Sequence, residues 1–581
     1  MYKPAPPRPK KTDIVRSRNG CKSCRERRTK VRRIRGTART RLTSRTKCDE
    51  KRPTCGTCAR LGRVCESVKP PLKFQVVTAL PTKTSRRRGP SLSEPSRSEV
   101  QLFNRHDPSP KLPDINLIYS LQHTDRDVFY STYWEDHCLP ALHPIFRSTS
   151  EQLGLPVVKD AILALSSCNI SRINPERKSS ASLATMGSFS PSLTHQTRSQ
   201  LYYSSAIKKI TSLAQDDYQN NVILVLTTLV LFGYIEASMG NFEGFYCHVQ
   251  GMTALLVELR STTGNPLFRA LLAAWMQSQF LVWWARTYFS SLDVQRQLPS
   301  IALPRDLEGP SGSLHERRAV ALSILCASHR LNMSKTLQHW KYQPDPNLVF
   351  LLDEPLTNRE DLEDYAVQLK NESKRLDEWL SYLPPSEQPL AGHASETSPV
   401  LFQSHDAALN FAYHVVARIM QYTSFLQKIP SGDPQHLGSE CSETEPWVRL
   451  LLRIAQGTDM RTSVIRNNYT IGFSGLLLAA SLRCQDLSLS IEIEQWLQTL
   501  QDTHPTEEGA FPVYQVLAVV RAINQQKRMD RDVFGVSQPM DDGGGEPKFT
   551  GYNSQVITTL LVHGKWRSSG SLFTERIDFD L

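Results

Sequence analysis

The chain has 581 residues, of which 40% are hydrophobic and 22% are charged, so it is long enough to bury a large core. Its first residues, MYKPAPPRPKK, contain no apolar stretch, which argues against a secretory signal and hence against a disulfide framework. Charge is divided unevenly: residues 1–100 hold 29 Lys and Arg against 7 Asp and Glu, whereas the remaining residues are net negative. A basic head on a mildly acidic body indicates that the head binds nucleic acid.

Six cysteines lie close together in this head. They form two Cys-x2-Cys pairs, each followed by a single cysteine: Cys21, Cys24, Cys48, Cys55, Cys58 and Cys65. Such a set can give two zinc ions four thiolates each if two sulfurs bridge both metals. Zinc favours tetrahedral thiolate coordination, and a site with no open position is structural rather than catalytic. Surrounded by Arg and Lys, the cysteines predict a small, metal-stabilised nucleic-acid-binding module.

The residues between these cysteines resemble the fungal zinc binuclear cluster (Zn2Cys6) transcription factors. CKSCRERRTK at 21–30, KCDEKRPTCGTC at 47–58 and GRVC at 62–65 match that family in residue type as well as in spacing. The resemblance implies two structural Zn2+ ions held by the six cysteines, with Cys21 and Cys55 as bridging thiolates. It also implies a nuclear protein that binds double-stranded DNA, commonly at CGG triplets.

In the resembled family, the first short helix of the cluster presents basic residues to the major groove, which here are Arg25, Arg27 and Arg28. An arginine fork can donate two hydrogen bonds to guanine O6 and N7, so Arg28 is predicted to contact a base. Arg25, Lys51 and Arg52 are predicted to contact phosphate, which positions the module without specifying sequence. The alternative for each of these cations is a solvated surface charge.

The spacing departs from the family pattern between the second and third cysteines, where 23 residues stand in place of the usual six. Removing Val31–Lys47 restores the family spacing, and these 17 residues match the coding length of a short fungal intron. We hypothesise that this segment is a retained intron read in frame. The alternative is a genuine basic loop insertion.

Composition divides the chain into four segments. Residues 1–15 are predicted to be a disordered basic N-terminus, and 16–67 the Zn2Cys6 DNA-binding domain. Residues 68–113 are rich in Pro, Ser, Thr and basic side chains, which predicts a disordered linker. Residues 114–581 form the regulatory domain. The sequence after the cluster does not contain three successive apolar heptads, so a coiled-coil dimer is not predicted. A homodimer formed by other means stays an open alternative.

The regulatory domain is predicted to be large and all-α, because apolar residues recur at helical spacing between Pro and Gly breaks. The expected helices are 125–137, 157–170, 196–213, 220–237, 242–259, 267–288, 314–340, 359–383, 406–426, 448–455, 472–487, 491–500 and 511–528. Val222–Phe232 is apolar but shorter than the ~20 residues of a bilayer span, so we expect a buried core helix and no membrane partner. The tryptophans Trp275, Trp283 and Trp284 are expected in the core.

Residues Leu231–Leu256 resemble the core of the fungal-specific transcription factor domain, and Val157–Ile170 fits the same family. This resemblance implies contacts with the transcription machinery or co-regulators. Two acidic-hydrophobic stretches, Asp530–Asp542 and Leu572–Leu581, resemble activation segments whose acids keep apolar side chains solvated. The alternative for both is ordinary surface.

No sequence motif in the body assembles a nucleophile with a base. Cys247 and His248 are adjacent, so on a helix they point about 100° apart. Ser474 follows Gly472 and Phe473 but lacks the full GxSxG spacing of a nucleophile elbow. A buried polar pair of Glu236 and His248 across two helices is predicted instead.

These observations predict a sequence-specific, zinc-dependent DNA-binding regulator of RNA polymerase II transcription that is not an enzyme. Two alternatives stay open. One is a co-regulator that acts through protein contacts because its zinc cluster is impaired. The other is a metabolic enzyme with a basic nucleic-acid-binding head.

Overall fold

The computed structural model describes Thr54, residues 58–59 and most of the chain beyond residue 122. The described ranges of that larger part are 123–147, 156–173, 176–177, 189–190, 192–213, 221–258, 265–309, 312–340, 360–390, 398–422, 443–503, 507–509, 511–539 and 559–578. The chain divides into two compact units, Met1–Gln75 and Val76–Leu581. Within its described residues the second unit is largely helical, as the sequence predicted.

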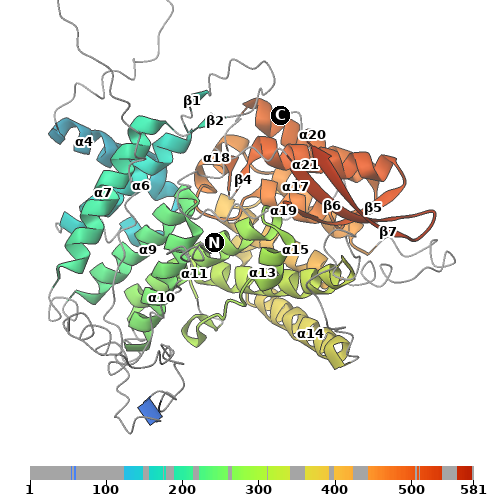
Figure 1. Ribbon diagram of the computed structural model, residues 1–581, viewed down its shortest axis with the longest axis horizontal. Helices are drawn as coiled ribbons and strands as arrows, with labels where there is room; N and C mark the ends of the chain where they lie inside the picture. Colours follow the sequence, from blue (N-terminus) through green and yellow to red (C-terminus); the bar gives the residue numbers. More distant parts are fainter. Residues whose placement is uncertain are drawn as a thin grey trace, which may run out of the picture. The chain divides into compact units, whose positions relative to one another are not determined.

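A first helix group occupies the N-terminal part of this unit (Figure 1, blue to green). It consists of α4 (His123–Tyr133), which runs on into η3 (Trp134–Cys138) and η4 (Leu139–Ala141), then α6 (Pro156–Ile173), α7 (Leu193–Thr211), α9 (Val222–Met239) and α10 (Phe242–Glu258). Pro156 opens α6, where a missing N–H costs nothing. Gly240, with a φ of 69°, ends α9 in the left-handed conformation that glycine adopts without strain.

A second helix group follows (Figure 1, yellow-green to red). Its elements are α13 (Leu314–Trp340), α14 (Glu360–Ser381), η7 (Pro385–Glu387), α15 (His405–Gln421), α17 (Glu445–Gln456), α18 (Met460–Arg466), α19 (Phe473–Ser481), α20 (Leu487–Thr503) and α21 (Val513–Arg528). Side chains cap the starts of several of these helices: Ser404, for example, accepts from the Ala407 N–H at 3.1 Å, and Asp459 accepts from the Thr462 N–H at 2.9 Å.

Helix α11 (Pro266–Tyr288) lies between the two groups, because it packs against both α9 and α13. The short elements α12 (Leu292–Gln297) and η6 (Arg305–Leu307) continue the chain from it. Every helix expected from the sequence is present, with ends displaced by a few residues. The short helices α12 and α18 were not predicted.

A three-stranded antiparallel sheet packs on the second group, and the sequence analysis did not predict it. Its strands are β5 (Arg531–Ser537), β6 (Thr559–Trp566) and β7 (Leu572–Asp578), in the order β5-β6-β7. Two-residue strand pairs also occur, β1 (Glu176–Arg177) with β2 (Phe189–Ser190) and β3 (Glu507–Glu508) with β4 (Phe511–Pro512).

The sheet corrects the interpretation of two stretches as solvated activation segments. Residues 531–537 and 572–578, which lie within those stretches, are strands paired with β6. Two of their acids form ion pairs within the sheet: Arg567 reaches Asp532 at 2.9 Å, and Arg531 pairs with Glu575, whose side chain is 42% exposed. Acidic composition alone therefore does not identify an activation segment, because acidic residues also form ion pairs between the strands of a sheet.

The core predictions are confirmed. Helix α9 is long and apolar enough to cross a membrane, with a mean hydropathy of 2.0 over 18 residues, but 89% of it is buried inside the protein. The three tryptophans of α11 are buried as well. Trp275 stacks on Phe245 of α10 with ring centroids 6.0 Å apart, which joins α10 to α11 through aromatic contact.

Candidate functional site

The predicted zinc and DNA-binding residues lie almost entirely outside the described residues. Cys58 is described, and it is a buried side chain on a helical pair of residues, 58–59. The residues outside the described part are Cys21, Cys24, Cys48, Cys55, Cys65, Arg25, Arg27, Arg28, Lys51 and Arg52. Six thiols are a donor set that fits zinc, and burial of Cys58 suits a closed metal site. Within the described residues no cluster of three or more His, Cys, Asp or Glu could hold a metal.

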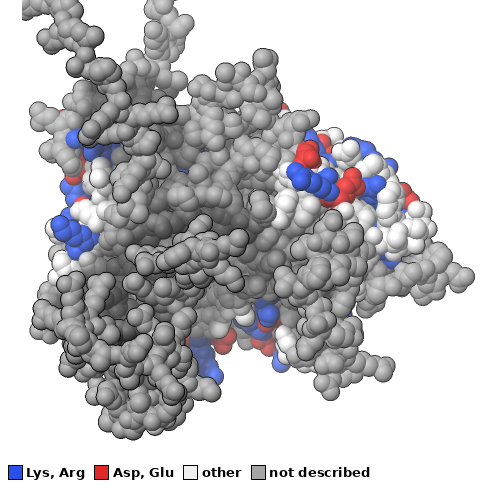
Figure 2. Space-filling view, viewed as in Figure 1, with Lys and Arg blue, Asp and Glu red and all other residues white. Residues whose placement is uncertain are grey.

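The described surface of the second unit carries mixed charge. Over the end formed by α20, α21 and the sheet, Figure 2 shows Lys and Arg beside Asp and Glu. Arg521, for example, donates to Glu494 at 3.2 Å across α21 and α20. Paired charges give a surface of low net potential, unlike the uniformly basic sequence of the head.

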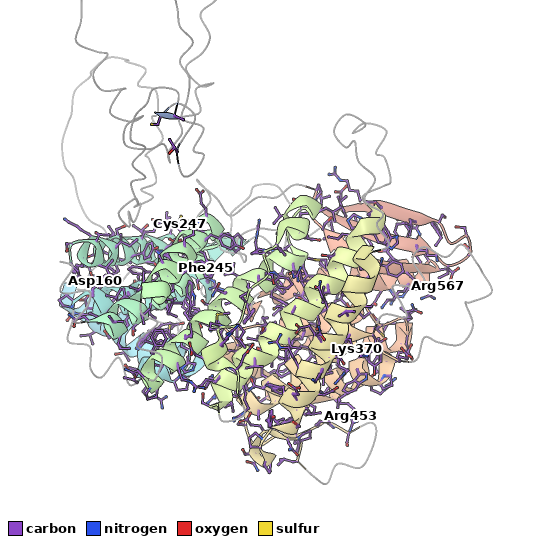
Figure 3. The ribbon with its side chains drawn as sticks, turned by 90° about the horizontal axis from the view of Figure 1, so that it is seen from below. Asp160, Phe245, Cys247, Lys370, Arg453 and Arg567 are labelled. Atoms are coloured by element: carbon purple, nitrogen blue, oxygen red, sulfur yellow. The ribbon has the colours of Figure 1, made fainter. Side chains whose placement is uncertain are left out.

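The structure separates Cys247 from His248, as expected for neighbours on a helix. Cys247 is exposed at the margin of α10 (Figure 3), whereas His248 is buried. The imidazole Nε2 of His248 lies 2.7 Å from the Tyr203 hydroxyl of α7, and that hydroxyl donates to Glu236 of α9 at 2.5 Å. Glu236 and His248 therefore form the predicted polar pair, 3.8 Å apart, with Tyr203 joining them.

The same glutamate organises the connection from α9 to α10. Asn241 donates to Glu236 Oε2 at 2.7 Å and accepts from the Gly244 N–H at 3.1 Å. A Cβ on Gly244 would lie 2.4 Å from Asn241 Nδ2 and 2.6 Å from Glu236 Oε1, so any larger residue would displace these hydrogen-bonded side chains. The motif that resembles the fungal domain core is thus a packing unit of α7, α9 and α10. Sequence reasoning missed Tyr203, although it lies on the buried stripe of α7 with Ala206 and Ile210.

Two adjacent buried glutamates on β3 were also missed. Because strand side chains alternate, Glu507 and Glu508 point in opposite directions. Glu508 accepts from the backbone N–H groups of Phe473 and Ser474, at 3.0 and 2.8 Å, and so caps the N-terminus of α19. The Ser474 hydroxyl donates to the Glu508 carbonyl at 2.9 Å, a structural role that agrees with the absence of a nucleophile elbow.

The other end of α19 carries buried cations. Lys527 of α21 donates to the Ser481 carbonyl at 3.0 Å, and Arg483 donates to the Leu482 carbonyl at 3.2 Å. Burial lowers the pKa of Lys527 to about 8. A carboxylate at the N-terminus and cations at the C-terminus match the helix dipole, which stabilises a helix whose residues are all buried.

Glu507 faces the first helix group. Its carboxylate pairs with Arg172 at the end of α6, and both side chains are buried. Nearby, the Tyr469 hydroxyl donates to Cys138 Sγ at 3.6 Å, and burial raises the pKa of that thiol to about 12. These contacts join parts of the chain more than 300 residues apart.

Comparison with known proteins gives one short similarity. A stretch of 82 residues is 34% identical to the transcription regulator lscL of Purpureocillium lilacinum, and it covers 12% of this chain and 19% of that protein. No protein-family model and no solved structure matches the chain. The similarity supports transcription regulation as the general kind of function.

Proposed function

We propose that the chain is a zinc-dependent regulator of RNA polymerase II transcription that binds double-stranded DNA through residues 16–67. The observation that carries this proposal is the cysteine pattern Cys21-x2-Cys24, Cys48 and Cys55-x2-Cys58-x6-Cys65, set among basic residues. The similarity to a transcription regulator and the basic charge of residues 1–100 support it.

The six cysteines would hold two structural zinc ions, which cross-link a segment too short to bury a core of its own. Arg28 would donate to guanine O6 and N7 of a CGG-type triplet. Arg25, Arg27, Lys51 and Arg52 would fix the module on the duplex, and neutralising phosphate makes such binding salt-dependent. The helical domain would supply contacts with the transcription machinery or co-regulators.

The segment Val31–Lys47 does not forbid this function on entropic grounds. Closing a loop of 23 residues instead of six costs about 1.2 kcal/mol more. Structural zinc binding contributes roughly 10–16 kcal/mol in small peptides. Geometry is the greater concern, because Lys30 and Cys48 are adjacent in sequence once the segment is removed. This observation favours a second candidate, a co-regulator with an impaired cluster that acts through protein contacts alone.

A mobility-shift experiment separates the two candidates. The full chain and a variant that lacks Val31–Lys47 are each titrated onto duplexes with and without CGG triplets, with added zinc or with a chelator. Zinc-dependent binding by both proteins supports the proposal for the chain as written. Binding by the shortened protein alone supports the co-regulator for this sequence and the retained-intron hypothesis. Failure of both proteins to prefer CGG duplexes would contradict the proposed DNA reading.

A further inference from the structure

The first and second helix groups meet at a polar seam. We define it by six side chains, of which the first group contributes three and the second group three: Cys138, His143 and Arg172, and His315, Tyr469 and Glu507. The imidazoles of His143 and His315 pack against each other at a tilt of 51°, with ring centroids 4.6 Å apart. All six are polar or ionisable, although five of them are buried.

The contacts of α9 and α10 with α11 have a different chemistry. Helix α9 meets α11 through Gly233, where an added Cβ would lie 3.1 Å from the Trp275 ring. Phe245 stacks on the same tryptophan. Separating such apolar surfaces exposes them to water at a cost proportional to their area. Separating polar groups costs less, because water replaces the hydrogen bonds that are lost.

The ion pair of Arg172 and Glu507 joins α6 of the first group to β3, which is fixed in the second group. Glu508, the next residue, is fixed in the second group by Phe473, Ser474 and the Ser463 hydroxyl, which donates to it at 2.8 Å. Strand β3 therefore holds Glu507 in a set position, from which it reaches across to α6. A buried ion pair adds little net stability over apolar side chains, yet losing one partner leaves a buried charge without its counter-ion.

We propose that the helical domain opens at the polar seam while each helix group stays folded, and that Arg172 with Glu507 is the latch of this opening. Helix α11, which packs on both groups, remains the joint between them. Proteins open locally where contacts are least apolar, and polar interfaces between packed units are where relative motion occurs. The proposed opening involves the helical domain alone, so its test does not depend on whether the chain binds zinc or DNA.

Thiol labelling of the full chain tests the opening without any substitution. Cys138 lies in the seam, whereas Cys326 of α13 and Cys484 beside α19 lie inside the second group, and all three are buried. A thiol reagent is added and each cysteine is followed by peptide mass spectrometry. Cys138 should react at least about tenfold faster than the other two, with a weaker dependence on added urea. Equal rates with equal urea dependence would overturn the proposal.

Substitutions then test the latch. Glu507→Gln should accelerate labelling of Cys138 on the order of 100-fold and leave Cys326 and Cys484 unchanged. The control Glu378→Gln, on an exposed part of α14, should change none of them. Equal acceleration of all three cysteines by Glu507→Gln would mean global unfolding and would overturn the proposal. The double variant Arg172→Met, Glu507→Met leaves no buried charge unpaired, so its Cys138 rate should lie between those of the original chain and of Glu507→Gln. A Cys138 rate in Glu507→Gln no faster than in the original chain would refute the latch.

Discussion

The basic head and the helical domain differ in how many residues their structure and proposed function depend on. In the head, six cysteines and a few basic residues carry the proposed zinc and DNA binding. In the helical domain, buried contacts are spread over hundreds of residues, and polar clusters such as Tyr203, Glu236 and His248 join elements that are distant in sequence. A short metal-bound module depends on each ligand, whereas a large core distributes its stability. Four substitutions or conditions test this difference.

The largest effect is expected from Cys55→Ser. If Cys55 bridges two zinc ions as proposed, its loss would remove a ligand from both, and zinc binding supplies roughly 10–16 kcal/mol of folding free energy in small zinc-binding peptides. Zinc-dependent DNA binding should be abolished, as measured by mobility shift. Circular dichroism at 222 nm should change little, because the long helices that the structure describes, from α4 onward, belong to the second unit. Retained, zinc-sensitive DNA binding would refute the ligand assignment.

Within the helical domain, Glu508→Ala should have the strongest effect of the single changes considered. It removes the acceptor of the Phe473 and Ser474 N–H groups at the buried start of α19, and uncapped buried donors cost about 3 kcal/mol or more in total. Urea unfolding followed by circular dichroism measures the loss. Glu378→Ala on the exposed face of α14 is the control and should cost under about 1 kcal/mol. Equal losses in both variants would contradict the capping role.

The sequence predicted the helices well and the polar clusters poorly. Helices such as α13 could be placed because apolar residues recur over many turns, and Pro or Gly marks their ends. Strands β5 and β7 were missed because each is seven residues long and its alternation is interrupted by charged residues. The charged residues of β5 and β7 pair with residues elsewhere in the sheet. Asp532 of β5 pairs with Arg567, and Glu575 of β7 pairs with Arg531 of β5.

For the candidate sites too, the sequence predicted groups of residues that are close in the chain and missed pairs that are far apart. The six cysteines could be recognised because their spacing is local, within residues 21–65. Glu236 and His248 were predicted as a pair because they lie on consecutive helices. Glu507 and Arg172 could not be paired from sequence, since nothing local relates residues on α6 and β3. Long-range pairing of buried charges is decided by tertiary packing, which single-sequence patterns do not report.

In the head, Arg28→Ala should have a moderate effect that differs in kind from Lys51→Ala. Loss of a bidentate contact to guanine costs about 1–3 kcal/mol and relaxes specificity for the triplet. Loss of a phosphate contact weakens binding to all sequences alike. It also reduces the slope of log Kd against the logarithm of the salt concentration by about one. Mobility shifts on CGG and scrambled duplexes at several salt concentrations measure both. Equal effects on the two duplexes for Arg28→Ala would contradict base readout.

The smallest effect is a pH dependence carried by one buried histidine of the helical domain. His414 of α15 lies between the rings of Trp379 and Trp447, and burial lowers its pKa to about 4. Below a pH of about 6.5 the unfolded chain takes up a proton that folded His414 does not, so stability falls as pH decreases toward 4. Between pH 7.5 and 5.5 this residue should cost about 1 kcal/mol. His414→Phe keeps the aromatic packing and removes the titration, so its free energy of unfolding should fall by that much less over the same interval. An unchanged pH dependence in this variant would show that the acid sensitivity of the helical domain arises elsewhere, at His315 or His329, whose pKa values burial lowers to about 3.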